Sequence, residues 1–367
     1  MAQTQIPFGD PKAQKKWSAN LAVDVLSKSY FSKKFVGTGP NNIIEMKTDV
    51  ESDQGDRVSF DLSVQLRGRP TTGDNRVEGQ EENLRFYTDE VIIDQTRKGV
   101  SAGGRMTRKR TAHDMRKVAR DRLGDYWQEY LDQLMFMYLA GARGMNEDFL
   151  EDTSYTGHAG NPLQAPDSGH ILFGGSATSK ATLTSSDVMN RELIEKAATE
   201  ASMMRATDPE TANMMPVTIE GEEHYVTVMS PFQEHDLRTS VGAAGWLELQ
   251  KAAAAAEGSK NKIFKGGMGM ISNVVLHSHK STIRFDDAGA GADLPASRAL
   301  FMGRQAGVCA YGVPGGSKFS WFEKRVDGDN EPIVIAGTIL GTKKTRFNGR
   351  DFGVMALDTY AKSPKAA

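Results

Sequence analysis

The chain has 367 residues, of which 45 are Lys or Arg and 47 are Asp or Glu, and its formal net charge is −2. This balance excludes a protein that is drawn to nucleic acid or to an anionic membrane by its net charge. A single cysteine, Cys309, excludes an internal disulfide framework and a zinc site built from thiols, and its small and apolar neighbours favour a buried, inert thiol.

The N-terminal sequence MAQTQIPFGDPKAQKKW lacks the apolar core of a signal peptide, and the chain contains no run of about 18 apolar residues. We therefore expect a soluble protein that is made and kept in the cytoplasm. Residues 11–36 carry apolar side chains at helical spacing, among them Trp17, Leu21 and Val25, and they end in a polar segment around Pro40. This pattern predicts an N-terminal arm with one amphipathic helix.

Two extended segments follow, separated by a long polar tip. Residues 57–66 alternate strictly between apolar and polar side chains, and residues 84–93 form a second extended run. A lone two-stranded hairpin of this kind is marginal in water, and a neighbouring subunit is one natural cover for it. Its charged side chains favour charge matching at a contact surface; they are Arg67, Arg69, Arg76, Glu78, Glu81 and Glu82.

The stretch RKGVSAGGRMTRKR, residues 97–110, contains a G-x-S-x-G pattern centred on Ser101. A serine hydrolase would need an apolar strand directly before this motif and an acid and a histidine later in the chain, but polar residues precede it. A phosphate-binding loop would need a lysine where Arg105 stands and a hydroxyl where Met106 stands. Neither a hydrolase nor a nucleotide-binding protein is favoured.

Apolar residues at spacings of three and four then predict one helix of about 30 residues, from Thr107 or Thr111 to Tyr138, or roughly 45 Å. Eight of the eighteen residues from Arg105 to Arg122 are basic. The basic positions favour a solvated or subunit-contacting face, with phosphate contact as the alternative; they include Arg108, Lys109, Arg110, Arg116, Lys117 and Arg120.

The rest of the chain mixes helices and strands, which suits an α+β fold. Helices are predicted at 186–204 and 243–257, strands at 224–231, 271–277 and 281–285, and further strands from 331 to 361 that pair with each other and with the base of the hairpin. His277 and His279 have a spacing that metals can use, with Asp286 and Asp287 near in sequence, but two satisfied surface histidines are favoured.

The order of these parts resembles the major capsid proteins of tailed bacteriophages, which have the Hong Kong phage type of fold. Several separated blocks carry the resemblance in order; they are FYTDEVIIDQ, HYVTVMSPFQEHDLR, GMGMISNVVLHSH, SRALFMGRQAGVCAYG and KKTRFNGRDFGVMALDTYA. They are most similar to the podophage group that packages a giant virion RNA polymerase. The resemblance covers the chain from about Lys15 to Ala361.

The resemblance implies an α+β capsid fold with five parts. Residues 1–50 would form the N-terminal arm, residues 51–98 the hairpin known as the E-loop, and residues 99–186 a peripheral domain with a long spine helix. Residues 187–328 would form an axial domain, and residues 329–367 would return as strands to the peripheral domain. In this setting Gly99, Gly103 and Gly104 would be a hinge between the E-loop and the spine helix.

The family implies no enzyme activity and no cofactor. Copies of the chain would assemble as hexamers and pentamers into an icosahedral head around double-stranded DNA, which they would contact without sequence preference. Further partners would be a portal protein, a scaffolding protein and in some heads a decoration protein, and there would be no membrane partner. The chain would be found in the virion after assembly in the host bacterial cytoplasm. The alternative is a DNA-binding protein that uses the basic segment 105–122.

Some relatives of the fold cross-link their subunits through a lysine on the E-loop. This sequence has no lysine between Lys47 and Lys98, so we expect a shell without such covalent bonds. Self-scaffolding members also carry a large N-terminal extension, and only about 55 residues precede the first long strand here. The resemblance therefore implies a separate scaffolding protein if one is used.

Overall fold

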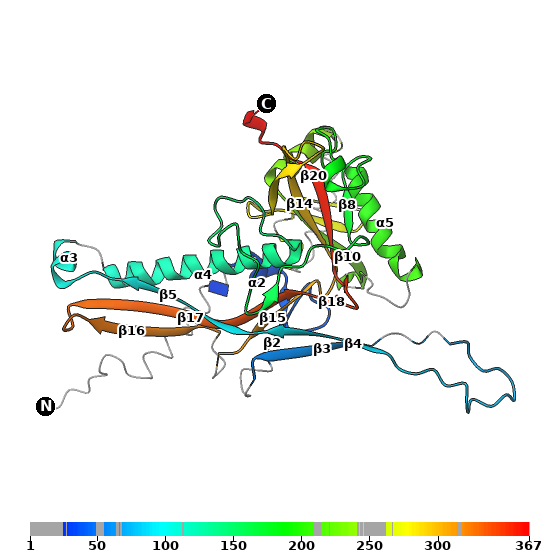
Figure 1. Cartoon of the computed structure of the whole chain (residues 1–367), viewed down its shortest axis with the longest axis horizontal. Coiled ribbons are helices and arrows are strands. Elements are labelled where there is room, and N and C mark those ends of the chain that lie inside the picture. Colours follow the sequence, from blue (N-terminus) through cyan, green and yellow to red (C-terminus); the bar gives the residue numbers. More distant parts are fainter. Residues whose placement is uncertain are drawn as a thin grey trace.

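One long helix packs against two β-sheets and joins them into a single elongated molecule (Figure 1). The structure is a computed structural model that describes residues 25–26, 28–48, 55–63, 66, 68–111, 114–207, 214–219, 221–240, 242, 245, 262–265, 267–313 and 318–366. The predicted helix at 243–257, apart from residue 245, and the residues Trp17 and Leu21 lie outside these ranges. None of the helices in the described part of the chain combines the length and apolar character needed to cross a membrane.

Helix α4, Met115–Ala140, is the long helix. It begins where the side chain of Asp114 accepts hydrogen bonds from the first free N–H groups of the helix, and it ends at Gly141, which has a φ of 67°. A side chain at Gly141 would place its Cβ 1.9 Å from the carbonyl oxygen of Gln164, so only glycine fits. The C-terminal part of α4, residues 130–140, is buried on all sides.

The predicted long helix is present, but its start at Thr107 is wrong because the basic segment is divided. A short helix, α3 (Arg105–Arg110), ends at Thr111, which has an extended backbone (φ −111°, ψ 144°). The second helix starts only after Asp114. A β-branched residue and a residue whose carboxylate binds free N–H groups both favour a helix end over a helix interior, which explains the break.

The six-stranded sheet lies under α4, and its longest strand is β17, Glu331–Lys344. Strand β17 pairs antiparallel with β5 at the base of the hairpin, with β16 and with β15. Val334, Ala336 and Leu340 of β17 pack into the core that α4 covers. The other members are β1 (Val36–Gly37), β2 (Ile44–Lys47), β5 (Asp94–Ser101), β15 (Gly307–Tyr311) and β16 (Ser320–Val326).

The eight-stranded sheet forms the second body, and both of its faces are buried. On strand β14, Leu300 and Met302 point into the core shared with α4, whereas Ala299 and Phe301 point into a second core that contains helix α5, Arg191–Thr207. Its strands are β8 (Ile171–Phe173), β9 (Val217–Ile219), β10 (Glu222–Met229), β11 (Gly269–Ile271), β12 (Val274–Ser278), β13 (Arg284–Ala288), β14 (Leu294–Met302) and β20 (Val354–Tyr360).

The C-terminal strands do not pair with each other as we expected. Strand β17 stays in the six-stranded sheet, but β20 pairs with β14 and β8 in the eight-stranded sheet. In the same way, β15 and β16 belong to the six-stranded sheet although they precede residue 329. Strand pairing over long sequence separations depends on the whole fold and is not visible in local alternation. The predicted helix at 186–204 is present as α5, with its start five residues later.

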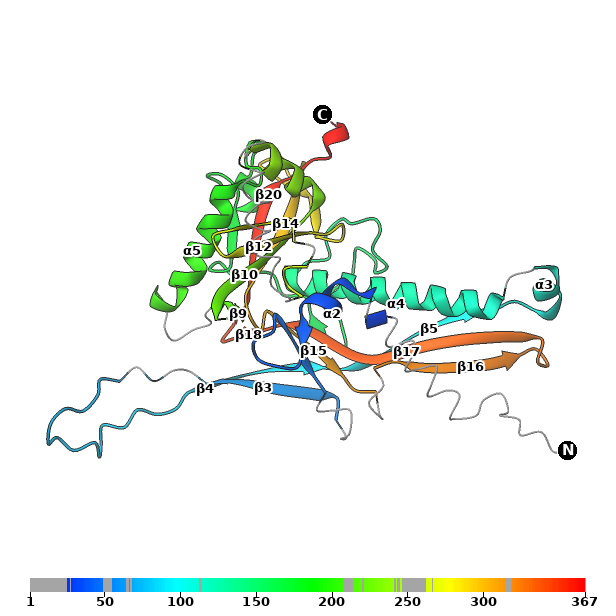
Figure 2. The ribbon, with the colours of Figure 1, turned by 180° about the vertical axis from the view of Figure 1, so that it is seen from behind.

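The predicted hairpin is present as the antiparallel ribbon β3–β4, Arg57–Ser63 and Phe86–Ile92. Its alternation is confirmed as far as Ser63, because Val58 is buried and Phe60 and Leu62 are half-buried while the residues between them are exposed; residues 64 and 65 lie outside the described residues. The tip extends away from the body on the side opposite to α3 (Figure 2).

Shorter elements complete the fold. Helix α2, Tyr30–Lys34, is capped by Ser29 and docks on α4, where Oδ1 of Asp132 accepts a 2.7 Å hydrogen bond from the Ser29 hydroxyl. A helix also runs through residues 231–240. The remaining elements are β6 (Gly157–His158), β7 (Asn161–Pro162), β18 (Arg346–Phe347), β19 (Arg350–Asp351) and the 3₁₀ turns Lys180–Thr182 and Pro364–Ala366.

Candidate intersubunit surfaces

Ser101 does not have the surroundings of a nucleophile. It is exposed at the end of β5, its hydroxyl contacts the carboxylate of Glu331, and it accepts a 3.1 Å hydrogen bond from the N–H of Gly103. A nucleophilic serine needs a base that is itself oriented by a third group, and no histidine is among its hydrogen-bond partners in the described residues. The polar hydroxyl therefore closes a turn.

His277 is buried and His279 is half-buried, so the assignment of His277 to the surface was wrong. The Nε2 atom of His277 lies 2.8 Å from the carbonyl oxygen of Ile263, and its Nδ1 atom lies 3.4 Å from Nζ of Lys34. His279 packs against the rings of Tyr30 and Phe136. Burial lowers the pKa of both imidazoles to about 4. In the described residues, no cluster of three or more His, Cys, Asp or Glu side chains is arranged to hold a metal ion.

Cys309 is buried, as its neighbours predicted. Burial raises the pKa of its thiol to about 11, which keeps the thiol protonated and unreactive near neutral pH.

The ribbon β3–β4 and its tip present apolar side chains to solvent. Four of them are more than half exposed: Leu66, Val77, Leu84 and Phe86. Exposed apolar side chains of this size, gathered on a segment that extends from the body, mark an interaction surface.

The predicted charged residues of this tip are exposed as well. Glu81 and Glu82 accept hydrogen bonds from the N–H groups of Gly79 and Gly68, which order the tip locally. The other described members are Arg69, Arg76 and Glu78, all exposed, and Arg67 lies outside the described residues. Their charge matching with a neighbouring subunit stays a prediction.

The three hinge glycines occupy different conformations. Gly99 lies inside strand β5 opposite Ile335, so it is not at a bend. Gly103 has a φ of 73°, a conformation that favours glycine, and Gly104 is the N-cap of α3. The N–H of Arg105 and the guanidinium of Arg108 both donate to Asn330 in the turn between β16 and β17. The bend is therefore at Gly103–Gly104, and this turn holds the start of α3.

The basic residues do not form one continuous stripe. Arg116 makes an ion pair of 2.7 Å with the largely buried carboxylate of Glu323, and Arg108 binds Asn330 as described above. Lys109, Arg110 and Lys117 are exposed, and Arg120 is half-buried. Because several of these cations bind groups within the chain, the segment offers less free positive charge than its sequence suggests.

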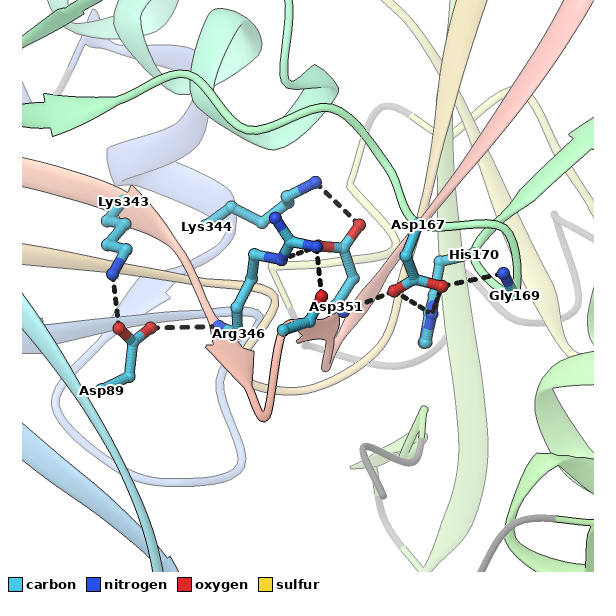
Figure 3. Close-up of polar contacts among 9 residues, drawn as sticks. Asp89, Asp167, Gly169, His170, Lys343, Lys344, Arg346 and Asp351 are labelled. Carbon is cyan, nitrogen blue, oxygen red and sulfur yellow. Dashed lines mark hydrogen bonds and ion pairs between the residues drawn. The ribbon is translucent and has the colours of Figure 1, made fainter.

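A buried polar junction, which the sequence analysis missed, lies where the ribbon meets both sheets (Figure 3). Lys344 and Asp351 form a 2.7 Å ion pair in which both side chains are at most 2% exposed. Arg346 lies beside them, with its Nε atom 3.1 Å from the second oxygen of Asp351. The signal was the charge-rich segment KKTRFNGRD between two apolar strands, because charges at such positions must be paired when they are buried.

A second buried ion pair lies within the eight-stranded sheet, and its arginine also binds the end of α4. Arg298 on β14 donates two hydrogen bonds, of 2.7 and 2.6 Å, to Asp358 on β20. Its third nitrogen donates to the carbonyl oxygen of Ala140 at 2.8 Å and so satisfies a free carbonyl group at the end of the helix.

Comparison with known proteins points to one class of protein. Residues 5–363 match the phage capsid protein family. The chain is 27% identical over 354 residues to the major capsid protein of Pseudomonas phage KPP25, covering 89% of each chain.

The solved structures that match this chain are also phage capsids. The capsid of Ralstonia phage GP4 matches with a TM-score of 0.89 and 66% identity over 99% of both chains. The capsid of cyanophage Pam1 has a TM-score of 0.69 and 21% identity, covering 92% of this chain and 93% of that one, and so supports the fold. The predicted α+β fold of tailed-phage capsid proteins is confirmed. The chain belongs to the phage capsid protein family, and it is a structural protein of the phage head rather than an enzyme.

Proposed function

We propose that this chain builds the shell of the head by extending its ribbon, the E-loop, over a neighbouring copy. The observation that supports this most is the exposure of Leu66, Val77, Leu84 and Phe86 on a segment that projects from the body. Covering these side chains removes apolar area from water, which stabilises the contact by about 25 cal/mol per Å² of buried area. The described part of a single chain leaves these side chains more than half exposed, whereas an assembled shell would supply a neighbouring surface for every copy.

The contact is of the head-to-tail kind, because the tip of one copy meets a different surface of the next. Such contacts form rings when the rotation between copies closes. Each contact is weak alone, and many simultaneous contacts give the shell its stability. We infer that hexamers and pentamers are the closed rings and that they form an icosahedral shell in the virion around double-stranded DNA.

The remaining partners follow from the same proposal. Portal, scaffolding and decoration proteins would bind the assembled shell, which would form in the host bacterial cytoplasm, and the packaged DNA would contact the shell without sequence preference. The five domain boundaries from the sequence remain our division of the subunit, with strands exchanged between the bodies as described. The similarity to the podophage group with a virion RNA polymerase also stays a prediction.

The test compares assembly of the full chain with that of a variant in which Leu66, Val77, Leu84 and Phe86 are all changed to Ser. The unmodified protein should give shells, tubes or hexamers by size-exclusion chromatography and negative-stain microscopy. The variant should remain a folded, soluble 40.1 kDa monomer with an unchanged circular dichroism spectrum, because these side chains lie outside the cores. A matched control changes the exposed Met145 and Leu150 to Ser and should assemble. A stable monomer of the unmodified chain would contradict the proposal.

The absence of lysine between Lys47 and Lys98 gives a second expectation for the shell. Particles boiled in denaturant should release a single monomer band on a gel, because no amine is available on this segment for a covalent link. A ladder of multimers would show that another residue supplies the bond.

A DNA-binding protein that uses the segment 105–122 is less well supported, because several of its cations are paired within the chain. That function would require affinity for DNA that falls steeply with salt concentration in a species that stays small in solution.

A further inference from the structure

Residues 345–353 connect the two sheets, because β17 ends at Lys344 in the six-stranded sheet and β20 begins at Val354 in the eight-stranded sheet. The small hairpin β18–β19 occupies the middle of this connection. Its turn contains Asn348 and Gly349 with φ values of 50° and 74°, the tight two-residue turn that matches the twist of a hairpin. The connection is therefore a structured element that spans the two bodies.

Two carboxylates from different parts of the molecule bind the two ends of this hairpin (Figure 3). At its first residue, the N–H of Arg346 donates to Asp89 on strand β4 of the E-loop, at 3.1 Å. At its last residue, the N–H of Asp351 donates to Asp167, at 2.6 Å. Asp167 lies in the segment that leads into β8 of the eight-stranded sheet, and it also binds His170 and the N–H of Gly169.

The hairpin is held rigid between these two attachments. The buried pair Lys344–Asp351 ties its end to the end of β17, and the guanidinium of Arg346 donates to the carbonyl oxygen of Gly349 within the turn. Phe347 packs edge-on against Phe60 of the E-loop. Buried charges need their partners in place, so this arrangement has little freedom to change without loss of pairing.

A cavity lies beside the point where the E-loop contacts the hairpin. It has a volume of about 200 Å³ and lies between β3 and the body, lined by Phe60, Leu62, Thr345 and Phe347 among others. Close packing alone therefore does not fix the ribbon at this point. On the side of β4, Lys343 makes an ion pair with Asp89, and Asn161 exchanges two hydrogen bonds with the backbone of Ile92.

We propose that the β18–β19 hairpin is a coupling element. It sets the angle of the E-loop, at the part of β4 around Asp89, relative to the eight-stranded sheet. A shift of that sheet would act through Asp167, the hairpin and Asp89 on the ribbon. The proposal deepens the proposed function, because the ribbon angle decides which surface of a neighbour the tip reaches, and it rests on that function only for its effect on assembly.

Hydrogen–deuterium exchange of the full chain with the substitution Asp167→Ala tests the coupling. Asp167 bonds to Gly169, His170 and Asp351, none of which lies in the ribbon. If the hairpin transmits the change, amide exchange in peptides covering 57–63 and 86–92 should become roughly tenfold faster. A purely local role would raise exchange only around 163–173 and 350–352, and that result would overturn the proposal.

Two further variants keep the result decisive. Asp167→Asn retains an oxygen that accepts the N–H of Asp351, so it should restore most of the protection in the ribbon. The control Asp287→Ala changes an exposed carboxylate on β13 of the same sheet, removes its ion pair with Lys180 and should leave the ribbon unchanged. Hydrogen–deuterium exchange of the backbone amides can be measured whether or not the chain assembles. Loss of coupling and failure of assembly are therefore separate outcomes.

Discussion

The buried ion pair Arg298–Asp358 should contribute strongly to stability. Both side chains are at most 8% exposed, and Arg298 also binds the last turn of α4. The substitution Arg298→Met would leave the carboxylate of Asp358 buried without its cation, at a cost of about 3 to 5 kcal/mol in the free energy of unfolding. Chemical denaturation of the soluble full chain measures this cost.

The matched control is Arg191→Met, which breaks an exposed pair with Glu195 one helical turn away. It should cost about 0.5 kcal/mol or less. Equal losses for the two variants would mean that burial does not decide the strength of these pairs.

Individual residues were predictable from the sequence where the local pattern decides their surroundings. The burial of Cys309 follows from its neighbours, and the alternation from Val58 to Leu62 follows from the strand period. Arg298 and Asp358 were not predictable, because they meet only through the pairing of β14 with β20. The burial of His277 likewise depends on α2, which comes from a distant part of the chain.

At the scale of elements, helix α2 docks beside two neutral histidines, and this contact should weaken in acid. The two histidines lie near the cations Lys34 on α2 and Lys280 on the following turn, and the carboxylate of Asp148 is the opposing charge at His279. Their pKa is lowered from 6.5 to about 4 by burial and then by Lys34 and Lys280. The unfolded chain therefore binds these protons first as the pH falls.

Because the unfolded chain takes up these protons at higher pH than the folded chain, acid favours unfolding. The contribution of these two histidines to the free energy of unfolding should be constant above about pH 6.5. It should fall as the pH drops from there toward 4, by roughly 2 kcal/mol per histidine at pH 5. The variant His277→Gln, which keeps a donor for the carbonyl of Ile263, should show a smaller loss between pH 7 and pH 5. Identical pH profiles of unfolding for the two proteins would contradict this assignment.

The bend between the E-loop and the helices gives a second prediction at this scale. Valine at both Gly103 and Gly104 should impair assembly or maturation while the subunit stays soluble, because Gly103 has a φ of 73° that valine adopts poorly and its Cβ would crowd Thr107. Gly99→Ala, inside β5, is the control and should assemble normally. Normal shells from the double valine variant would rule out a hinge at this bend.

The whole molecule explains why some elements were predicted and others were not. The E-loop strands, α5 and the C-terminal half of α4 follow from strand and helix periods that are local in sequence. The division of the basic segment at Thr111, the partner of β20 and the junction around Lys344 and Asp351 depend on caps and on contacts across the fold. The exposure of the E-loop tip was predictable because its residues are mostly polar, and its contact with a neighbouring copy stays a prediction.

A cryo-electron microscopy reconstruction of the assembled particle tests the role of the E-loop most directly, through the surroundings of Leu66, Val77, Leu84 and Phe86. These side chains are 53% to 61% exposed in the isolated chain. We predict that most of them are buried against a neighbouring copy in every subunit of the shell. E-loop tips that remain in solvent in a fully closed shell would contradict the role that we assign to them.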